Sequence, residues 1–394
     1  MRSETRLSPK FISAVLSWYD ASRRDLPWRK IQGTACAEPA EAYAVLVSEV
    51  MLQQTTVPAV LSYFDKWMKK YPTIEQLARA DLDEVLLQWE GLGYYSRARN
   101  LHAAAREIVA KYKGRIPPDP RELKKLPGIG DYTAAAVASI AFGVRAPALD
   151  ANNLRVWSRL LASSDKKRII GVFSRVLPSE RPGDFNQALM DLGTSVCTSG
   201  DPTCPLCPLS PWCRAFNAGR VTEFPEKKAR PDTIRVKAAI GIILKDGKIL
   251  VQRRPEDGLM AGLWEFPGGK IGRAARRGDT ETRRHGEKAG IGEPEYRGVG
   301  GNSLETPEEA VVREVREETG LKVQVCEKIG VFNHAYTRFR VKLHVFICRR
   351  KAGTVHNPSA RWVTLEELEG LAMPSVNRRI VKKLEEQLKA ECDD

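Results

Sequence analysis

The chain has 394 residues, of which 42% are hydrophobic and 28% are charged, so it holds enough apolar material for two packed cores. Its formal net charge of +14 suits a polyanionic partner such as nucleic acid, although a basic protein without such a partner fits equally well at this point. The N-terminus lacks the apolar stretch of a signal peptide, and the longest small-apolar run, 133–144, is too short to span a bilayer. We therefore expect a cytoplasmic protein with no membrane contact.

Helical patterns dominate the first half of the chain. Residues 8–20 place apolar side chains on one face of a helix behind Ser8, a plausible cap. No alternating strand pattern interrupts the segments that follow. The sequence therefore predicts an all-α domain over 1–218. Its further amphipathic segments are expected at roughly 43–70, 73–89, 96–112, 121–142, 152–162 and 185–195.

A charged segment with a proline near each end separates this domain from a different one. Residues 219–233 have the composition of a linker. Beyond them, two apolar runs flank Asp246-Gly247 as in a β-hairpin, which predicts an α/β domain over 234–394. Its strands are expected at 236–244, 248–252, 322–332 and 339–349, and its helices near 306–319 and 375–390.

Two segments differ in composition from their surroundings. Residues 32–42 are rich in Ala and Glu, and residues 272–301 are rich in Arg, Gly and Glu with few apolar anchors. Such segments cannot build a core of their own, so both are predicted to be surface loops inserted into their domains.

Four of the eight cysteines cluster within seventeen residues, in the spacing C-x6-C-x2-C-x5-C. Disulfides are uncommon in the cytoplasm, and short gaps stiffened by prolines let four sulfurs converge on one centre. Four thiolates without a nearby histidine fit structural zinc and a [4Fe–4S] cluster equally well. The other four cysteines are isolated and are interpreted as ordinary thiols. The predicted ligands are Cys197, Cys204, Cys207 and Cys213.

A short glycine turn, Leu126-Pro127-Gly128-Ile129-Gly130, joins two predicted helices. The glycines allow a tight turn that exposes backbone amides at a helix start, where phosphates bind, although a lone turn of this kind is usually only a turn. Together with Asp150 and the cysteine spacing, this segment resembles the helix-hairpin-helix glycosylases of the endonuclease III superfamily. That resemblance implies that the four cysteines hold a [4Fe–4S] cluster and that Gly128 and Gly130 contact DNA.

Removal of a base from DNA requires an acid for the leaving base and a carboxylate near the sugar, and the base must first leave the stack. Glu49 lies in an apolar helical segment, where burial would raise its pKa and keep a proton available. From these residues alone, a salt-bridged helix glutamate is the alternative.

Three further motifs resemble the adenine DNA glycosylase family: EVMLQQT from Glu49, LPWR from Leu26 and WEGLGYYSR from Trp89. The resemblance implies an enzyme that removes adenine opposite 8-oxoguanine or guanine in double-stranded DNA. Glu49 then protonates adenine and Asp150 stabilises the sugar cation. The same resemblance places Tyr132 and Asn152 near the sugar, Gln54, Thr55, Leu92 and Tyr94 in the duplex, and Trp28, Arg29 and Gln187 around adenine.

One position predicts the type of reaction. Bifunctional relatives carry a lysine two residues after the second hairpin glycine, which forms a Schiff base with the sugar. This chain has Tyr132 there, and its nearest lysines, Lys124 and Lys125, precede the hairpin. The sequence therefore predicts a monofunctional glycosylase.

Two segments of the second domain resemble the parts of a Nudix box, 266–270 and 313–321, and removing 272–301 restores the spacing between them. Glu314, Glu317 and Glu318 would share one helix face and suit Mg²⁺ bound to a diphosphate, although such a face is ordinarily a solvated acidic one. In adenine glycosylases this domain recognises 8-oxoguanine, and the near-complete box leaves hydrolysis of oxidised nucleoside triphosphates open. The predicted contacts with the damaged guanine are Tyr336, Thr337 and Arg338, the last standing where a histidine is common.

The sequence thus predicts a monomeric adenine glycosylase with a helical cluster-bearing domain and a Nudix-like domain. Three rivals remain. A bifunctional pyrimidine glycosylase is disfavoured by Tyr132, and a protein that only senses damage is disfavoured by Glu49 and Asp150. The third rival is a nucleotide pyrophosphohydrolase that uses its helical domain only to bind DNA. It would hydrolyse oxidised dGTP in the presence of Mg²⁺, which separates it from a glycosylase.

Overall fold

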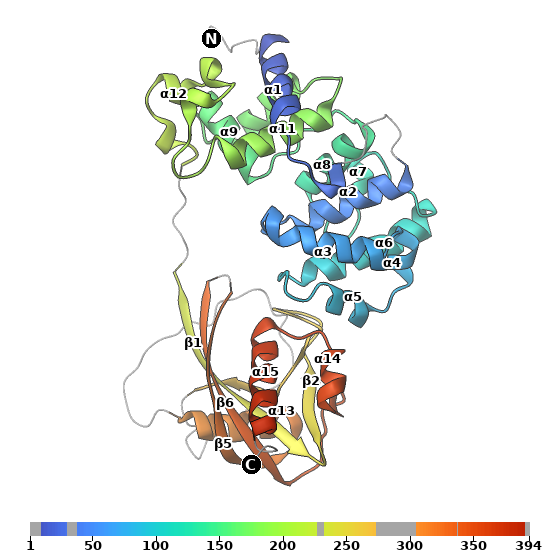
Figure 1. Cartoon of the computed structure of the whole chain (residues 1–394), viewed down its shortest axis with the longest axis vertical. Coiled ribbons are helices and arrows are strands. Elements are labelled where there is room, and N and C mark those ends of the chain that lie inside the picture. The colour runs from blue at the N-terminus through green and yellow to red at the C-terminus, as the bar shows by residue number, and fades with distance from the viewer. Residues whose placement is uncertain (1–8, 30–37, 227–231, 273–304, 337, 391–394) are drawn as a thin grey trace, which may run out of the picture. The chain divides into compact units, whose positions relative to one another are not determined.

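The computed structural model describes residues 9–29, 38–226, 232–272, 305–336 and 338–390. The chain divides into two compact units, Met1–Arg230 and Pro231–Asp394 (Figure 1). The first is helical and the second is α/β, so the predicted fold class is confirmed. No helix among the described residues is long and apolar enough to cross a membrane.

Helices of two lengths build the first unit. The apolar faces of these helices pack together, and one core joins α1 to α9, α10 and α11 around Trp157 and Phe173. The longer helices are α1 (Pro9–Ser22), α2 (Pro39–Met51), α3 (Val57–Lys70), α6 (Ser96–Tyr112), α8 (Asp131–Phe142), α9 (Ala151–Leu161), α10 (Lys166–Val176) and α11 (Pro182–Ser195). The shorter ones are η1 (Pro27–Arg29), α4 (Ile74–Arg79), α5 (Leu82–Gln88), α7 (Pro120–Leu123), η2 (Cys204–Leu206), η3 (Ser210–Trp212), α12 (Arg214–Asn217) and η4 (Val221–Glu223).

Several predicted helices are divided in the structure. The segment 43–70 is two helices, because the chain turns at 52–56, where Gln54 has a positive φ of 56°. The segments 73–89 and 121–142 are also two helices each, α4 with α5 and α7 with α8. Apolar periodicity continues across such turns because both flanking helices face the same core. Helix α10 was not predicted, although Asp165 caps it and Ile169 and Phe173 are buried.

One sheet of seven strands forms the centre of the second unit, in the order β3-β2-β1-β6-β5, with β4 beside β1 and β7 beside β2. Strands β1 and β6 are parallel, whereas β5 and β6 form a long antiparallel hairpin. The strands are β1 (Ile234–Lys245), β2 (Lys248–Arg253), β3 (Trp264–Glu265), β4 (Gly268–Lys270), β5 (Lys322–Tyr336), β6 (Phe339–Ala352) and β7 (Ala360–Val363). The sequence did not predict the short strands β3, β4 and β7.

Helices cover both faces of this sheet. On one face, α13 (Pro307–Thr319) buries Val311 and Val315 against Ile243 and Phe346. On the other, α15 (Ser375–Ala390) buries Ile380 and Leu384, together with residues that follow α14 (Leu365–Glu369). A sheet with helices on both faces matches the predicted Nudix-like architecture.

The two segments of foreign composition fall largely outside the described residues. Of the predicted insertion 272–301, only Gly272 is described, and its backbone N–H donates to Glu305 at 2.8 Å. Of the predicted loop 32–42, residues 32–37 lie outside the described residues. The remainder of that loop prediction is wrong, because α2 begins at Pro39 and is started by a capping box between Glu38 and Glu41.

Candidate active site

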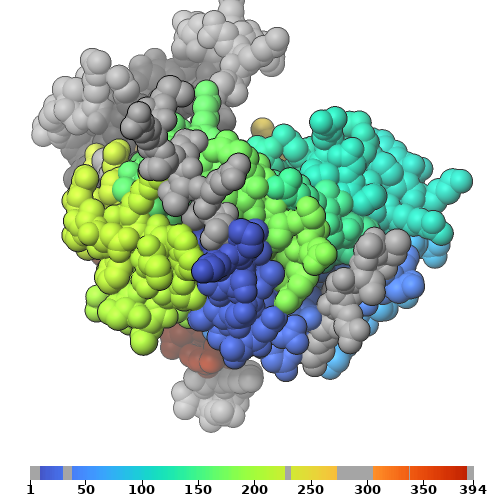
Figure 2. Space-filling view, turned by 90° about the horizontal axis from the view of Figure 1, so that it is seen from above, coloured from blue at the N-terminus to red at the C-terminus, as the bar shows by residue number. Residues whose placement is uncertain are grey.

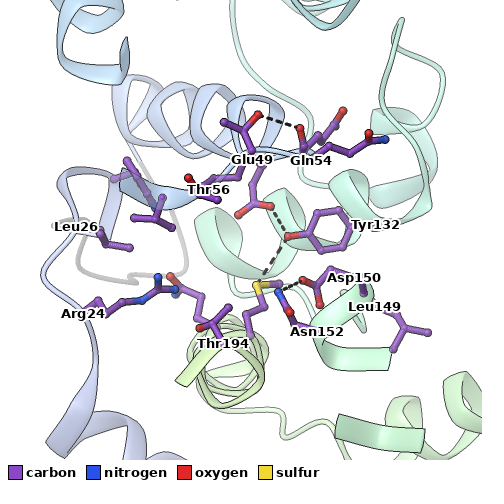
Figure 3. A pocket seen from close by; sticks show the side chains of 18 of the residues that line it. Arg24, Leu26, Glu49, Gln54, Thr56, Tyr132, Leu149, Asp150, Asn152 and Thr194 are labelled. Carbon is purple, nitrogen blue, oxygen red and sulfur yellow. Dashed lines mark hydrogen bonds between the residues drawn. The ribbon is translucent and has the colours of Figure 1, made fainter. Parts of the chain in front are cut away.

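One pocket of the helical unit, about 940 Å³ in volume, contains most of the residues predicted to act on the base and sugar (Figure 3). Its walls come from η1, the end of α2, the start of α8, the start of α9 and the middle of α11. Segments separated by more than a hundred residues therefore converge on one space. The predicted residues that line it are Trp28, Arg29, Glu49, Gln54, Thr55, Tyr132, Asp150, Asn152 and Gln187.

Glu49 lies in the last turn of α2 and points into this pocket, with only 5% of its surface exposed. Its pKa is raised from 4.5 to about 7, mainly by burial; the charge of Asp150 adds to the rise, whereas a hydrogen bond from Tyr132 and the charge of Arg29 oppose it. A glutamate with this pKa keeps a substantial protonated fraction near neutral pH. It therefore has the property that a general acid requires.

Tyr132, in the first turn of α8, donates its hydroxyl to Oε2 of Glu49 at 2.6 Å (Figure 3). Burial raises the pKa of Tyr132 well above 10, so the phenol stays neutral and acts as a donor. The bond fixes one carboxyl oxygen of Glu49 and leaves Oε1 to hold the exchangeable proton.

Asp150 caps α9, where its Oδ1 accepts from the backbone N–H of Asn153 at 2.6 Å. Its Oδ2 accepts from Nδ2 of Asn152 at 3.0 Å, and Arg155 in turn donates to Oδ1 of Asn152 at 3.0 Å. Burial raises the pKa of Asp150, and these hydrogen bonds oppose the rise. The carboxylate is therefore held in one orientation at the pocket wall.

An ion cluster that the sequence did not reveal lies beside the pocket. It holds Arg29, one of the lining residues. Asp191 accepts from Nη1 of Arg29 at 2.6 Å and from Nε of Arg24 at 3.0 Å. Burial would raise the pKa of Asp191, but its bonds to Arg29 and Arg24 hold it below the usual value. No local pattern could reveal this pairing, because Asp191 lies more than 160 residues from both arginines in the chain.

The other predicted DNA contacts lie outside the pocket lining. Tyr94 is 43% exposed, whereas Leu92 is buried at 8%. Gly128 has a φ of +73°, and a side chain there would meet Asn100, so the hairpin turn requires glycine at this position. Gly130 caps the start of α8.

The four predicted cysteine ligands line a second, small pocket together with Arg159 and Val221. Arg159 donates from Nη1 to Sγ of Cys197 at 3.2 Å, so a cation lies beside this sulfur. The cysteine segment packs on α1 through Trp212, whose ring centroid is 5.6 Å from that of Phe11. Figure 2 shows the cysteine segment (yellow-green) beside α1 (dark blue) on one face of this unit. Among the described residues, no three His, Cys, Asp or Glu side chains are arranged to hold a single metal ion.

In the second unit, the three predicted Mg²⁺ ligands lie on α13 but already have protein partners. Glu314 and Glu317 accept from Nη1 of Arg313 at 2.8 and 3.3 Å. Glu318 accepts from Nε2 of Gln252 and from the backbone N–H of Gly268, at 2.5 and 2.9 Å. The Mg²⁺ site therefore stays a prediction that these contacts do not support.

The predicted damaged-guanine contacts lie at the tip of the hairpin between β5 and β6. Tyr336 stacks between His334 and Phe339, with ring centroids 5.6 and 5.4 Å away. Arg338 lies over the ring of Phe339, and Thr337 is outside the described residues.

Family models match both units. Residues 47–174 match the HhH-GPD superfamily of base excision DNA repair proteins, and residues 238–383 match the NUDIX domain. The fold and the pocket thus define a helix-hairpin-helix DNA glycosylase with a Nudix-like domain.

Curated relatives narrow this class. The chain is 32% identical to the human adenine DNA glycosylase over 97% of its own length and 75% of that protein. It is 34% identical to the adenine DNA glycosylase of Rattus norvegicus, over 96% of its own length and 78% of that protein. A solved thymine-DNA glycosylase is 31% identical, with a TM-score of 0.48 over 53% of this chain and 95% of that one. The chain belongs to the adenine DNA glycosylase family, which confirms the family predicted from the motifs.

Proposed function

We propose that this protein removes adenine mispaired with 8-oxoguanine or guanine in double-stranded DNA, with Glu49 as the general acid and Asp150 as the carboxylate that stabilises the sugar cation. The observation that carries the proposal is the buried Glu49, hydrogen-bonded to Tyr132 and opposite Asp150 in one pocket. The names of its relatives support adenine as the base.

The reaction follows from these groups. Glu49 donates its proton to a ring nitrogen of the flipped adenine, so the bond from the sugar to the base breaks and its electron pair leaves with the base. The negative charge of Asp150 stabilises the oxocarbenium ion that develops on the sugar. Water then adds to the sugar and gives up a proton, which restores the acid form of Glu49, and an abasic site is left.

The same pocket supports a monofunctional enzyme. Tyr132 stands at the position that carries the nucleophilic lysine of bifunctional relatives, and its hydroxyl is occupied with Glu49. A phenol has no amine nitrogen and cannot form a Schiff base, so the strand stays intact after base removal.

The four cysteines are proposed to hold a [4Fe–4S] cluster. The donor set fits, because four sulfurs line one pocket beside the guanidinium of Arg159, which can stabilise the negative charge of a thiolate-bound cluster. When bound, the cluster holds the loop of η2 and η3 in shape and takes no part in base removal.

For the second unit we propose recognition of the damaged guanine through Tyr336 and Arg338, which offer a ring for stacking and a cation beside it. Hydrolysis of nucleotides there is less well supported, because the glutamates of α13 are already bound to Arg313, Gln252 and Gly268.

The test is a single-turnover assay on a duplex with one adenine opposite 8-oxoguanine, and a matched duplex with adenine opposite thymine as the control. We expect release of adenine from the first duplex and strand breaks only after alkali treatment. Strand breaks without alkali, or efficient borohydride trapping of the protein on DNA, would contradict a monofunctional reaction.

A further inference from the structure

A single buried guanidinium joins two segments that the proposed function places against DNA. Arg97, in α6, donates from Nη1 to the carbonyl oxygens of Val50, Met51 and Gln53, at 3.1, 2.7 and 2.5 Å. From Nη2 it donates to the carbonyl oxygens of Leu92 and Gly93, at 3.1 and 3.0 Å. We call residues 90–94, which carry Tyr94, the wedge loop. Arg97 therefore holds the wedge loop and the end of α2 at the same time.

The end of α2 that Arg97 holds is the turn that carries the proposed acid. Val50 and Met51 follow Glu49 directly, and α2 has no basic residue of its own in its last turn. A cation at the last carbonyls of a helix satisfies acceptors that lack partners and complements the helix dipole. A displacement of the Arg97 side chain would therefore also displace the backbone carbonyls that follow Glu49.

Backbone strain marks both segments next to the carbonyls that Arg97 binds. Gln54 has a φ of 56° and follows Gln53, and Tyr94 has a φ of 48° and follows Gly93. Residues other than glycine adopt this conformation at a cost, and it persists where surrounding contacts enforce it, often at functional sites. Both strained residues are proposed DNA contacts, so Arg97 enforces the two turns that present them.

The environment of Arg97 argues against a role in stability alone. It is 7% exposed and lies over the rings of Trp89 and Tyr94, 5.3 and 5.5 Å from their centroids. Within the described part of the chain, all its hydrogen-bond acceptors are backbone carbonyls and none is a carboxylate. Burial of a cation without a counter-charge is costly, and apolar residues of similar size would fill the space more favourably.

We propose that Arg97 is a positioning residue, which couples the seating of Tyr94 in the duplex to the placement of the Glu49 carboxyl. The proposal rests on the proposed function, since it assumes that Tyr94 enters DNA and that Glu49 acts on the base. When the duplex contacts the wedge loop, the hydrogen bonds of Arg97 would then hold the end of α2, and with it the Glu49 carboxyl, in place. We call this set of Arg97 hydrogen bonds the Arg97 bridge.

The first measurement is the single-turnover rate constant for adenine release at saturating protein in two variants. Arg97→Met removes every donor at nearly constant length, and we expect the rate constant of the active fraction to fall about a hundredfold. Arg97→Lys keeps the charge and part of the bonding, and we expect a fall of about tenfold. A purely structural role would lower the thermal midpoint and the active fraction but leave that rate constant unchanged.

The matched control is Tyr63→Phe. The Tyr63 hydroxyl donates to the carbonyl of Glu90 at 2.9 Å, so it also tethers the wedge loop, but within the described residues it makes no hydrogen bond to the end of α2. Loss of the Tyr63 hydroxyl removes one contact of the wedge loop but leaves every hydrogen bond of Arg97 in place. We expect Tyr63→Phe to change the rate constant by less than about threefold.

The decisive test is a double-mutant cycle with Tyr94→Leu. We expect Tyr94→Leu to slow release about tenfold in the wild-type and Tyr63→Phe backgrounds, but less than about twofold with Arg97→Met, because the coupling is already lost. Arg97→Lys replaces Arg97→Met in the cycle if the latter does not fold. An equal effect of Tyr94→Leu in all backgrounds would overturn the proposal.

A second readout separates this proposal from the proposed function. In the same proteins, 2-aminopurine beside the target adenine reports unstacking by its fluorescence. If the wild type releases no adenine, the proposed function fails, and the fluorescence alone decides on Arg97. The proposal is supported if Tyr94→Leu lowers the increase in 2-aminopurine fluorescence in the wild-type background but not in the Arg97→Met background. It is contradicted if Tyr94→Leu lowers this increase equally in both backgrounds.

Discussion

Glu49 of α2 and Glu317 of α13 both lie on helices that motifs single out, yet their surroundings differ. Glu49 is 5% exposed, lines an open pocket and accepts one bond from a neutral phenol. The side chain of Glu317 is 61% exposed and pairs with Arg313. Burial without a paired cation favours the protonated form of the Glu49 carboxyl, whereas the Glu317 carboxyl lies in solvent beside Arg313. The comparison teaches that the surroundings of each carboxyl, more than its motif, decide its chemistry.

The strongest way to break this comparison is Glu49→Gln. The amide keeps the size of the side chain but cannot donate the acid proton, so we expect the single-turnover rate of adenine release to fall about 1,000-fold or more. Binding of the duplex, measured by fluorescence anisotropy, should change little. A near-normal rate would mean that the acid is misassigned.

Asp150→Asn tests the second carboxyl of the same pocket, the one proposed to stabilise the sugar cation. Loss of the negative charge should slow release about a hundredfold, because the oxocarbenium ion loses its stabilising partner. Asparagine is as good a helix cap as aspartate, so the thermal midpoint should stay within a few degrees of the wild type. A large drop in the midpoint together with an unchanged rate would make Asp150 a structural cap only.

Tyr132→Phe sharpens the assignment through its pH dependence. The hydroxyl of Tyr132 stabilises the ionised form of Glu49, so its removal should raise the pKa of Glu49. The rate of release, which requires protonated Glu49, should then persist to higher pH than in the wild type. A pH profile that stays in place or moves to lower pH would contradict the role given to this bond.

The smallest effect is expected in the second unit. Glu317→Gln removes an exposed carboxyl that pairs with Arg313, so adenine release should change by less than about twofold. With Mg²⁺ and oxidised dGTP, wild type and variant should both show no pyrophosphate release above background. If the wild type hydrolyses oxidised dGTP in a Mg²⁺-dependent reaction and Glu317→Gln abolishes it, the second unit is also catalytic.

Part of this account was predictable from the sequence because it depends on local spacing. The four cysteines, the Gly128 turn and the EVMLQQT segment lie within short stretches, and their positions follow from the chain itself. The Asp191 cluster and the Arg97 bridge were not predictable, since they join residues more than forty positions apart and Arg97 binds carbonyls that every residue carries. The turn at 52–56 was hidden because the helices on both sides of it bury apolar residues, so the apolar pattern continues across the turn.

The most direct test of the central claim is the pH dependence of adenine release by the wild type under single turnover. If buried Glu49 supplies the proton, the rate should be constant at low pH and fall about tenfold per pH unit above a midpoint near the Glu49 pKa of about 7. A rate that is independent of pH, or that rises as pH increases through this range, would contradict Glu49 as the acid.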